Sequence, residues 1–155
     1  MKDDGLTHLT NLTELDICGG MNITTLVYKS LSNLTSLSLH RCAELTDEAM
    51  QYLVGLKKLV IDRYEPNTQI TDDGIKYLSN LTNLSMEYDG QITSRGYRCL
   101  TNLTFLNLTK CMGIDNEAIL HLVRLDHVRL DRCPNITAEC VTANGRFVIT
   151  RVIAT

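Results

Sequence analysis

The stretch Leu34–Asp47, which reads LTSLSLHRCAELTD, decides the fold of this 155-residue chain. It opens with an apolar residue, two variable residues, a second apolar residue, one variable residue and a third apolar residue. The same phrase occurs six times, starting at Leu12, Leu34, Leu56, Leu81, Leu103 and Leu125. Successive starts are 22, 22, 25, 22 and 22 residues apart. A nearly constant period of this length predicts stacked structural repeats.

A second phrase lies between the copies of the first. It reads LTDEAMQYLVGL from Leu45, ITDDGIKYLSNL from Ile70, ITSRGYRCLTNL from Ile92 and IDNEAILHLVRL from Ile114. Its Thr-Asp or Asp-Asn pair is typical of a helix start, where a side-chain oxygen accepts a free backbone N–H. The phrase predicts helices of about two turns over Glu48–Val54, Asp73–Ser79 and Glu117–Val123. The residues DDGLTHLTNL from Asp3 match DDGIKYLSNL from Asp72, so the sequence starts inside a repeat.

The spacing of the apolar residues predicts an α/β solenoid. The alternation in each first phrase is that of a short strand. Stacking puts the strands in one parallel sheet and the helices on its other side. Because helices are wider than strands, the solenoid should curve, with the strands on the concave face and the helices on the convex face. We expect one domain over residues 1–155, with a truncated helix over Thr137–Ala143. We also expect a terminal strand within Arg146–Ile153; the alternative for this last segment is a partial repeat.

Residues 3–143 resemble the leucine-rich-repeat family. The pattern Leu34-x-x-Leu37-x-Leu39-x-x-Cys42, followed by Leu45, is similar to the cysteine-containing repeats of F-box proteins. The 22-residue spacing is closer to the short repeats of internalin-like proteins. The resemblance implies a protein-interaction module that binds on its concave sheet. The first subclass implies substrate recognition in a ubiquitin ligase, and the second implies an extracellular or surface adhesion or effector module.

The six cysteines indicate a reduced, cytoplasmic chain rather than a disulfide scaffold. Cys42, Cys111 and Cys133 share one slot, where a buried thiol fills space beside a turn. A disulfide between Cys111 and Cys133 is the alternative. The N-terminal residues lack the apolar core of a secretion signal. Asn-Leu-Thr triplets, which would accept glycans in a secreted protein, are explained here by the repeat consensus.

Charge and motifs exclude other classes of function. The formal charge is 15 − 18 = −3, too acidic for a general nucleic-acid-binding surface. No apolar run approaches the roughly 20 residues that span a membrane. No phosphate-binding loop, zinc-ligand set or activated nucleophile is present, so we expect no enzyme activity, metal or cofactor. We expect a protein partner and a chain that is a monomer or part of a larger protein.

The variable strand positions predict the partner-binding surface. They form columns across the repeats, with an acidic column beside a basic one, and banded charge of this kind suits a protein partner. Aromatic residues and arginine dominate binding energy when they lie centrally. The candidate patch is Lys58, Val60, Asp62, Arg63, Glu87, Tyr88, Phe105, His127, Arg129 and Asp131. The inserted loop Arg63–Gln69 is expected at its rim. The alternative is that these charges only keep the sheet soluble.

Overall fold

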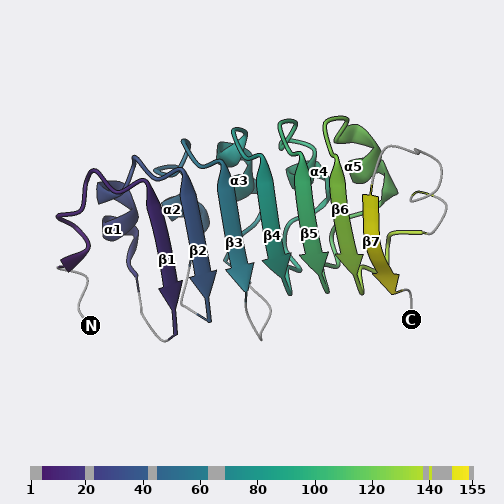
Figure 1. The fold of residues 1–155 in the computed structure, drawn as a ribbon, viewed down its shortest axis with the longest axis horizontal. Helices are drawn as coiled ribbons and strands as arrows, with labels where there is room; N and C mark the ends of the chain where they lie inside the picture. Colours follow the sequence, from purple (N-terminus) through teal and green to yellow (C-terminus); the bar gives the residue numbers. More distant parts are fainter. Residues whose placement is uncertain are drawn as a thin grey trace.

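A computed structural model describes residues 5–19, 23–41, 45–62, 69–137, 140 and, for the backbone alone, 148–153. In this part of the chain seven parallel strands form one sheet in sequence order (Figure 1). The strands are β1 (Glu14–Cys18), β2 (Ser36–His40), β3 (Lys58–Asp62), β4 (Asn83–Glu87), β5 (Phe105–Thr109), β6 (His127–Asp131) and β7 (Val148–Ile153). The predicted α/β solenoid is confirmed.

The register of the sheet repeats the spacing of the sequence. Leu37 pairs with Leu59, Leu59 with Leu84, and Leu84 with Leu106. Equivalent leucines therefore stack into columns, and each strand turns the same face toward the helices. The predicted terminal strand is also confirmed, because β7 pairs in parallel with β6, with an irregularity between Val128 and Leu130. Most of the predicted helix at 137–143 lies outside the described residues.

The helices are shorter than the two turns predicted for them. They are α1 (Thr25–Ser30), α2 (Asp47–Met50), α3 (Asp72–Ile75), the 3₁₀ turn η2 (Lys76–Leu78), α4 (Ser94–Tyr97) and α5 (Asn116–His121). After α2 the chain continues in three-residue turns, with Leu53 N–H donating to Met50 O at 3.0 Å and Leu56 N–H to Leu53 O at 3.0 Å. Such turns advance further per residue than an α-helix. A 22-residue repeat therefore returns to the sheet after one to two helical turns.

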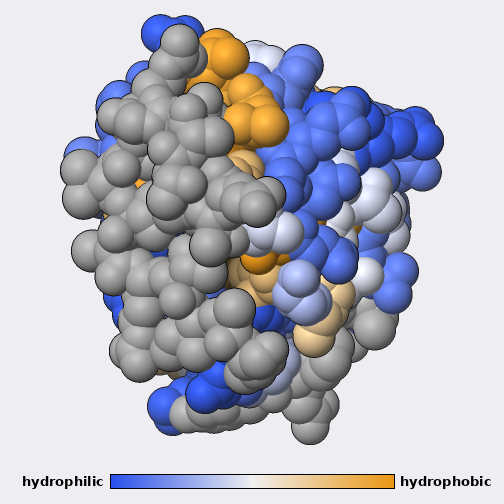
Figure 2. Space-filling view, turned by 90° about the vertical axis from the view of Figure 1, so that its right-hand side faces the viewer, coloured by the Kyte–Doolittle hydropathy of each residue, from blue (hydrophilic) through white to orange (hydrophobic). Residues whose placement is uncertain are grey.

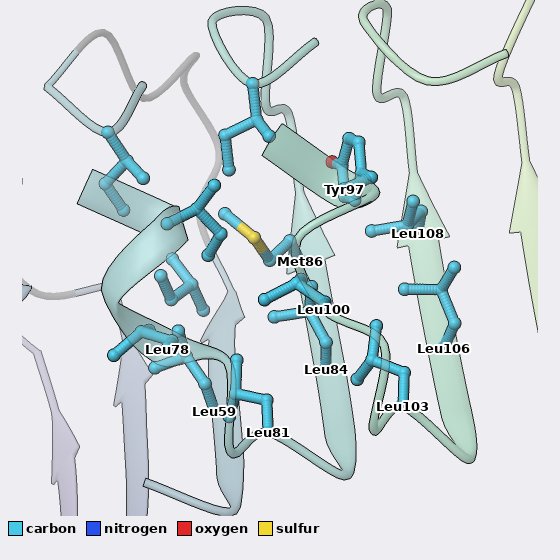
Figure 3. Close-up of a cluster of buried hydrophobic side chains, with 14 of the residues drawn as sticks. Leu59, Leu78, Leu81, Leu84, Met86, Tyr97, Leu100, Leu103, Leu106 and Leu108 are labelled. Carbon is cyan, nitrogen blue, oxygen red and sulfur yellow. The ribbon is translucent and has the colours of Figure 1, made fainter. Parts of the chain in front are cut away.

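The core lies between the sheet and the helices (Figure 3). Leu84 and Met86 from β4 point into it beside Leu106 and Leu108 from β5, and Tyr97 of α4 covers them. All five side chains are buried. Since part of the covering side chains comes from the neighbouring repeat, no repeat closes its own core.

The Asn-Leu-Thr triplets join each repeat to the one before it. The side-chain amides of Asn33, Asn80 and Asn102 donate to the backbone oxygens of Thr10, Val54 and Ser79, each at 2.9 Å. The threonines act similarly, since Thr104 Oγ1 donates to Thr82 O at 3.2 Å. These contacts explain why the Asn-Leu-Thr triplet recurs in the repeats without any role in glycosylation.

Two aspartates at the helix starts also connect repeats, which the sequence prediction missed. Thr46, Thr71 and Thr93 cap their own helices. Asp47 instead accepts from the N–H and hydroxyl of Thr71 at 2.8 and 2.6 Å, and Asp72 does the same with Thr93.

These aspartates explain two glycines. A Cβ at Gly74 would lie 2.1 Å from Asp47 Oδ1, and one at Gly96 would lie 2.4 Å from Asp72 Oδ1. The equivalent residue in the next repeat is Ala118, and there the preceding repeat carries the smaller Ser94. Aspartate in one repeat thus requires glycine in the next.

None of the helices in the described part of the chain is long and apolar enough to cross a bilayer. In the view toward the β7 end, the described surface is mostly hydrophilic, with a small hydrophobic group at the top (Figure 2).

Candidate protein-binding face

The sheet has one open face, which we call the sheet face. It consists of the strand side chains that alternate with the buried core residues and point away from the helices. The pairing register arranges them in three rows across β2–β6. The first row is Ser36, Lys58, Asn83, Phe105 and His127; the second is Ser38, Val60, Ser85, Asn107 and Arg129; the third is His40, Asp62, Glu87, Thr109 and Asp131.

The apolar part of the sheet face is Phe105, with Val60 two strands away. Phe105 is 38% exposed at the start of β5, a strand in which Leu106 and Leu108 are buried. Its partners across β4 and β6 are the polar residues Asn83 and His127. An exposed aromatic side chain without an apolar neighbour contributes little to the fold, and aromatic residues are typical of binding hot spots.

The third row concentrates negative charge at the ends of the strands. His40 lies between two carboxylates, with Nδ1 3.5 Å from Asp62 Oδ2 and Nε2 3.7 Å from Asp16 Oδ1. Partial burial raises the pKa of Glu87, and the neighbouring Asp62, which shares a hydrogen bond with it, raises that pKa further. The carboxylates therefore repel one another, and an approaching cation would relieve this repulsion.

The basic column beside the acidic one was predicted at the strand exit, with Tyr88 on the outer side of its strand, and this placement of Tyr88 is wrong. Arg41, Tyr88, Lys110 and Arg132 follow the last strand residue and adopt left-handed backbone conformations, with φ of 57°, 55°, 57° and 54°. The chain must turn sharply here to leave the sheet. Gly19 holds this position after β1 with φ 72°, and glycine adopts that conformation without strain. This glycine was the signal in the sequence that the column forms a turn.

Tyr88 therefore lies at the rim and not on the strand surface. The Lys110 ammonium stands 4.0 Å from the centre of the Tyr88 ring and also contacts the Tyr88 hydroxyl. This cation–π pair joins the turns after β4 and β5. Of the ten predicted patch residues, the structure brings together eight on the sheet face: Lys58, Val60, Asp62, Glu87, Phe105, His127, Arg129 and Asp131. Arg63 lies outside the described residues, as does residue 42 of the cysteine slot.

The cysteine slot contains a carboxylate in the fourth repeat, which sequence reasoning missed. Asp89 occupies the position of Cys111 and Cys133 and is fully buried. It accepts hydrogen bonds from the Gln91 N–H at 3.2 Å and from the Tyr97 hydroxyl at 3.0 Å. Burial raises the pKa of the Asp89 carboxyl despite these donors.

Cys111 and Cys133 are buried free thiols, as predicted. Each stands near backbone oxygens, with Cys111 Sγ 3.6 Å from Thr109 O and Cys133 Sγ 3.7 Å from Leu108 O. A hydrogen bond with Cys133, together with burial, raises the pKa of the Cys111 thiol. Among the described residues, no three His, Cys, Asp or Glu side chains are arranged to hold a metal ion.

Comparison with known proteins identifies the fold. No protein-family model matches the sequence, and no curated protein matches it. Solved structures do match: internalin C2 of Listeria monocytogenes is 21% identical with a TM-score of 0.71, over 96% of this chain and 64% of that one. A second Listeria monocytogenes internalin, inlF, is 19% identical with a TM-score of 0.69, over 96% of this chain and 44% of that one.

A leucine-rich-repeat protein of Leptospira interrogans is 21% identical with a TM-score of 0.68, and the match covers 94% of this chain and 38% of that one. The chain thus spans less than two thirds of each of these proteins. At such identities the likeness concerns the fold, which is a leucine-rich-repeat solenoid.

Proposed function

We propose that this chain is a protein-interaction module that binds its partner on the sheet face. The observation that supports this most strongly is Phe105, exposed on the sheet face at the start of β5. His127 lies beside it on β6, Arg129 lies on β6 in the next row, and Lys58 lies in the same row two strands away. An exposed aromatic residue with charged groups on the same face is the arrangement that interface hot spots favour. No catalytic step, metal or cofactor is part of this proposal.

The acidic third row supplies the orientation of the partner. Basic groups of the partner would meet Asp62, Glu87 and Asp131, while an apolar group would cover Phe105. Opposite charges at fixed positions set the register of two surfaces and speed their association. The rate of binding should therefore fall as salt is added, because partly exposed charges are screened.

The test uses two exposed apolar residues on opposite sides of the solenoid. Phe105→Ser should weaken binding of the natural partner by more than about 1 kcal/mol, as expected for a hot spot. Leu120→Ser is the control, since Leu120 is 47% exposed on α5, on the helix side. Both variants should keep their unfolding free energies within about 0.5 kcal/mol of the parent. The partner is first identified by cross-linking in cells and then measured by calorimetry.

Loss of binding in Leu120→Ser but not in Phe105→Ser would contradict the sheet-face proposal and assign the partner to the helices. A Tyr88→Ser variant then tests the rim. If the Tyr88–Lys110 pair belongs to the interface, this variant weakens binding as well, and if not, binding stays at the parental level.

As a finer proposal, the module recognises substrates for a ubiquitin ligase in the cytoplasm. The buried free thiols of the cysteine slot support it. The alternative is an extracellular or surface adhesion or effector module, which the short repeat supports. Thiol titration of protein isolated from its natural source separates the two: free thiols at all six cysteines favour the cytoplasm, and disulfides favour the exterior.

A further inference from the structure

A hollow of about 530 Å³ lies where the strands begin, on the edge of the sheet opposite the acidic row. We call it the strand-start hollow. Its lining residues are Gly55, Lys57, Asn80, Thr82, Asn102, Thr104 and Arg124. All of them belong to the Asn-Leu-Thr triplets or to the positions where those triplets are altered.

The hollow exists where two repeats depart from the triplet. The third repeat reads Gly55-Leu56-Lys57, and the sixth reads Arg124-Leu125-Asp126. Gly55 stands where other repeats have a bridging asparagine, so one side chain is missing from the row. Lys57 replaces a threonine, and Arg124 replaces an asparagine. Gly55 thus removes side-chain volume at the third-repeat end of the hollow. Lys57 places a basic group at that end, and Arg124 places one at the sixth-repeat end.

Neither basic group forms an ion pair with a carboxylate in the described part of the chain. Lys57 has no ion pair or side-chain hydrogen bond among the described residues, and Arg124 donates to the neutral Asn102 Oδ1 at 2.9 Å. No acidic residue lines the hollow. The nearest acid in the sequence is Asp126, which is exposed and forms no ion pair with Arg124. The hollow is therefore positively charged in a chain whose net charge is −3.

The middle of the hollow is neutral and polar. The Asn80 and Asn102 amides each use one N–H to bind a backbone oxygen, which leaves a second N–H on each. The hydroxyls of Thr82 and Thr104 donate to backbone carbonyl oxygens, and their oxygens keep lone pairs that can accept. A ligand there can both donate and accept, as a peptide backbone does.

From these features we infer that the strand-start hollow binds an extended acidic peptide segment, separately from the sheet face. Lys57 and Arg124 are three strand spacings apart, about 14 Å at the backbone. An extended peptide covers that distance in about four residues. Two carboxylates at positions i and i+4 would meet the two bases, and the peptide groups between them would meet the asparagines and threonines. A densely charged polyanion would need more bases than these two.

The probe is a fluorescein-labelled pentapeptide with glutamate at positions one and five and serine or glycine between. Its control replaces both glutamates with glutamine. Binding to the full chain is followed by fluorescence anisotropy, and the amide resonances of Asn80 and Asn102 are followed by NMR. We expect binding of the glutamate peptide, shifts at both asparagines, and no binding of the glutamine peptide.

Three variants restore the triplet and therefore suit the fold. Lys57→Thr and Arg124→Asn should each raise the dissociation constant about threefold or more, and together about tenfold or more. Gly55→Asn adds a side chain without changing charge. It fits, because a Cβ at Gly55 would lie 3.5 Å from Leu34 O, an ordinary contact. It should also weaken binding. The matched control, Lys29→Gln with Arg95→Gln, removes two exposed bases from helices α1 and α4 and should leave binding unchanged.

Four results would overturn the inference. The first is no binding of the glutamate peptide to the parent chain at millimolar concentration. The second is equal binding to the Lys57→Thr, Arg124→Asn double variant. The third is a set of shifts on the sheet face instead of at Asn80 and Asn102. The fourth is tighter binding of a sulfated oligosaccharide that depends on the same two bases, which would assign the hollow to polysaccharides. The proposed function of the sheet face is unaffected by each of these results, since it depends on Phe105.

Discussion

The first repeat and the central repeats carry the same sequence phrase but different surroundings. In the centre, Leu81 and Leu84 are completely buried, whereas the equivalent Leu12 and Leu15 of the first repeat are only partly buried, and Leu9 is 44% exposed. Asn33 binds the repeat before it, while Asn11 has no hydrogen-bond partner among the described residues. Identical residues thus contribute differently because, among the described residues, a preceding repeat packs against the central repeats and none packs against the first.

The interface between repeats, and not the single repeat, is therefore the unit of stability in this solenoid. The stacked leucines and the hydrogen bonds of the asparagine row and of Asp47 and Asp72 each join one repeat to its neighbour. Nearest-neighbour interfaces of this kind are general in repeat proteins. The pairs of equivalent positions allow direct tests, because one member of each pair serves as the control for the other.

The largest effect is expected in the leucine columns. Leu84→Ala should lower the unfolding free energy by about 2–5 kcal/mol, because a cavity forms between two repeats that cannot relax around it. Leu15→Ala should cost less than half as much, since water already reaches part of that side chain. Urea denaturation of both variants measures the difference. Equal losses would contradict the idea that neighbours set the contribution of each leucine.

The next effect concerns the glycines that accommodate aspartate. Gly74→Ala should cost about 1–3 kcal/mol, because the new Cβ would overlap Asp47. Gly5→Ala, at the equivalent position of the first repeat, should stay within about 0.5 kcal/mol, since no atom lies within 4 Å.

Adding Asp47→Ser to Gly74→Ala imitates the natural pair Ser94 and Ala118 and should recover part of the loss. A double variant no more stable than Gly74→Ala alone would show that the overlap with Asp47 is not the cause.

A buried carboxylate gives the central repeats a pH dependence. Asp89→Ala should cost about 1–3 kcal/mol, because the Gln91 N–H and the Tyr97 hydroxyl lose their acceptor. The pKa of Asp89 is raised in the folded state, so folding is penalised while the carboxyl is ionised. The stability of the parent relative to Asp89→Asn should therefore rise as the pH falls through the folded-state pKa. It should level off below the ordinary value of 3.8. Thermal melts of both proteins between pH 7 and about pH 3.5 check the sign, and a fall in relative stability with acid would contradict it.

The smallest effect is expected in the asparagine row. Asn33→Ala removes a hydrogen bond to Thr10 O and should cost about 0.5–1.5 kcal/mol. Asn11→Ala should leave the unfolding free energy unchanged to within about 0.3 kcal/mol, as it loses no partner. Chemical denaturation resolves the two if both are measured against the same parent. A loss in Asn11→Ala equal to that in Asn33→Ala would show that these asparagines act within their own repeat.

The sequence alone determined the number of repeats, the strand register and the buried columns, because a period of 22 residues leaves one way to stack equivalent leucines. It also predicted the terminal strand and eight residues of the sheet face. These features depend on local alternation and spacing, which a single sequence displays.

The remaining features depend on how the repeats pack against one another. The length of each helix is set by the distance that the chain must cover to return to the sheet. The left-handed turn at Tyr88 is set by the sharp change of direction with which the chain leaves the sheet. The pairing of Asp47 with Gly74 depends on residues more than 20 positions apart, and the hollow beside Gly55 depends on a missing side chain. The burial of Asp89 depends on how Tyr97 of its own repeat packs against it. These are tertiary contacts, and local propensity carries no information about which side chains will meet there.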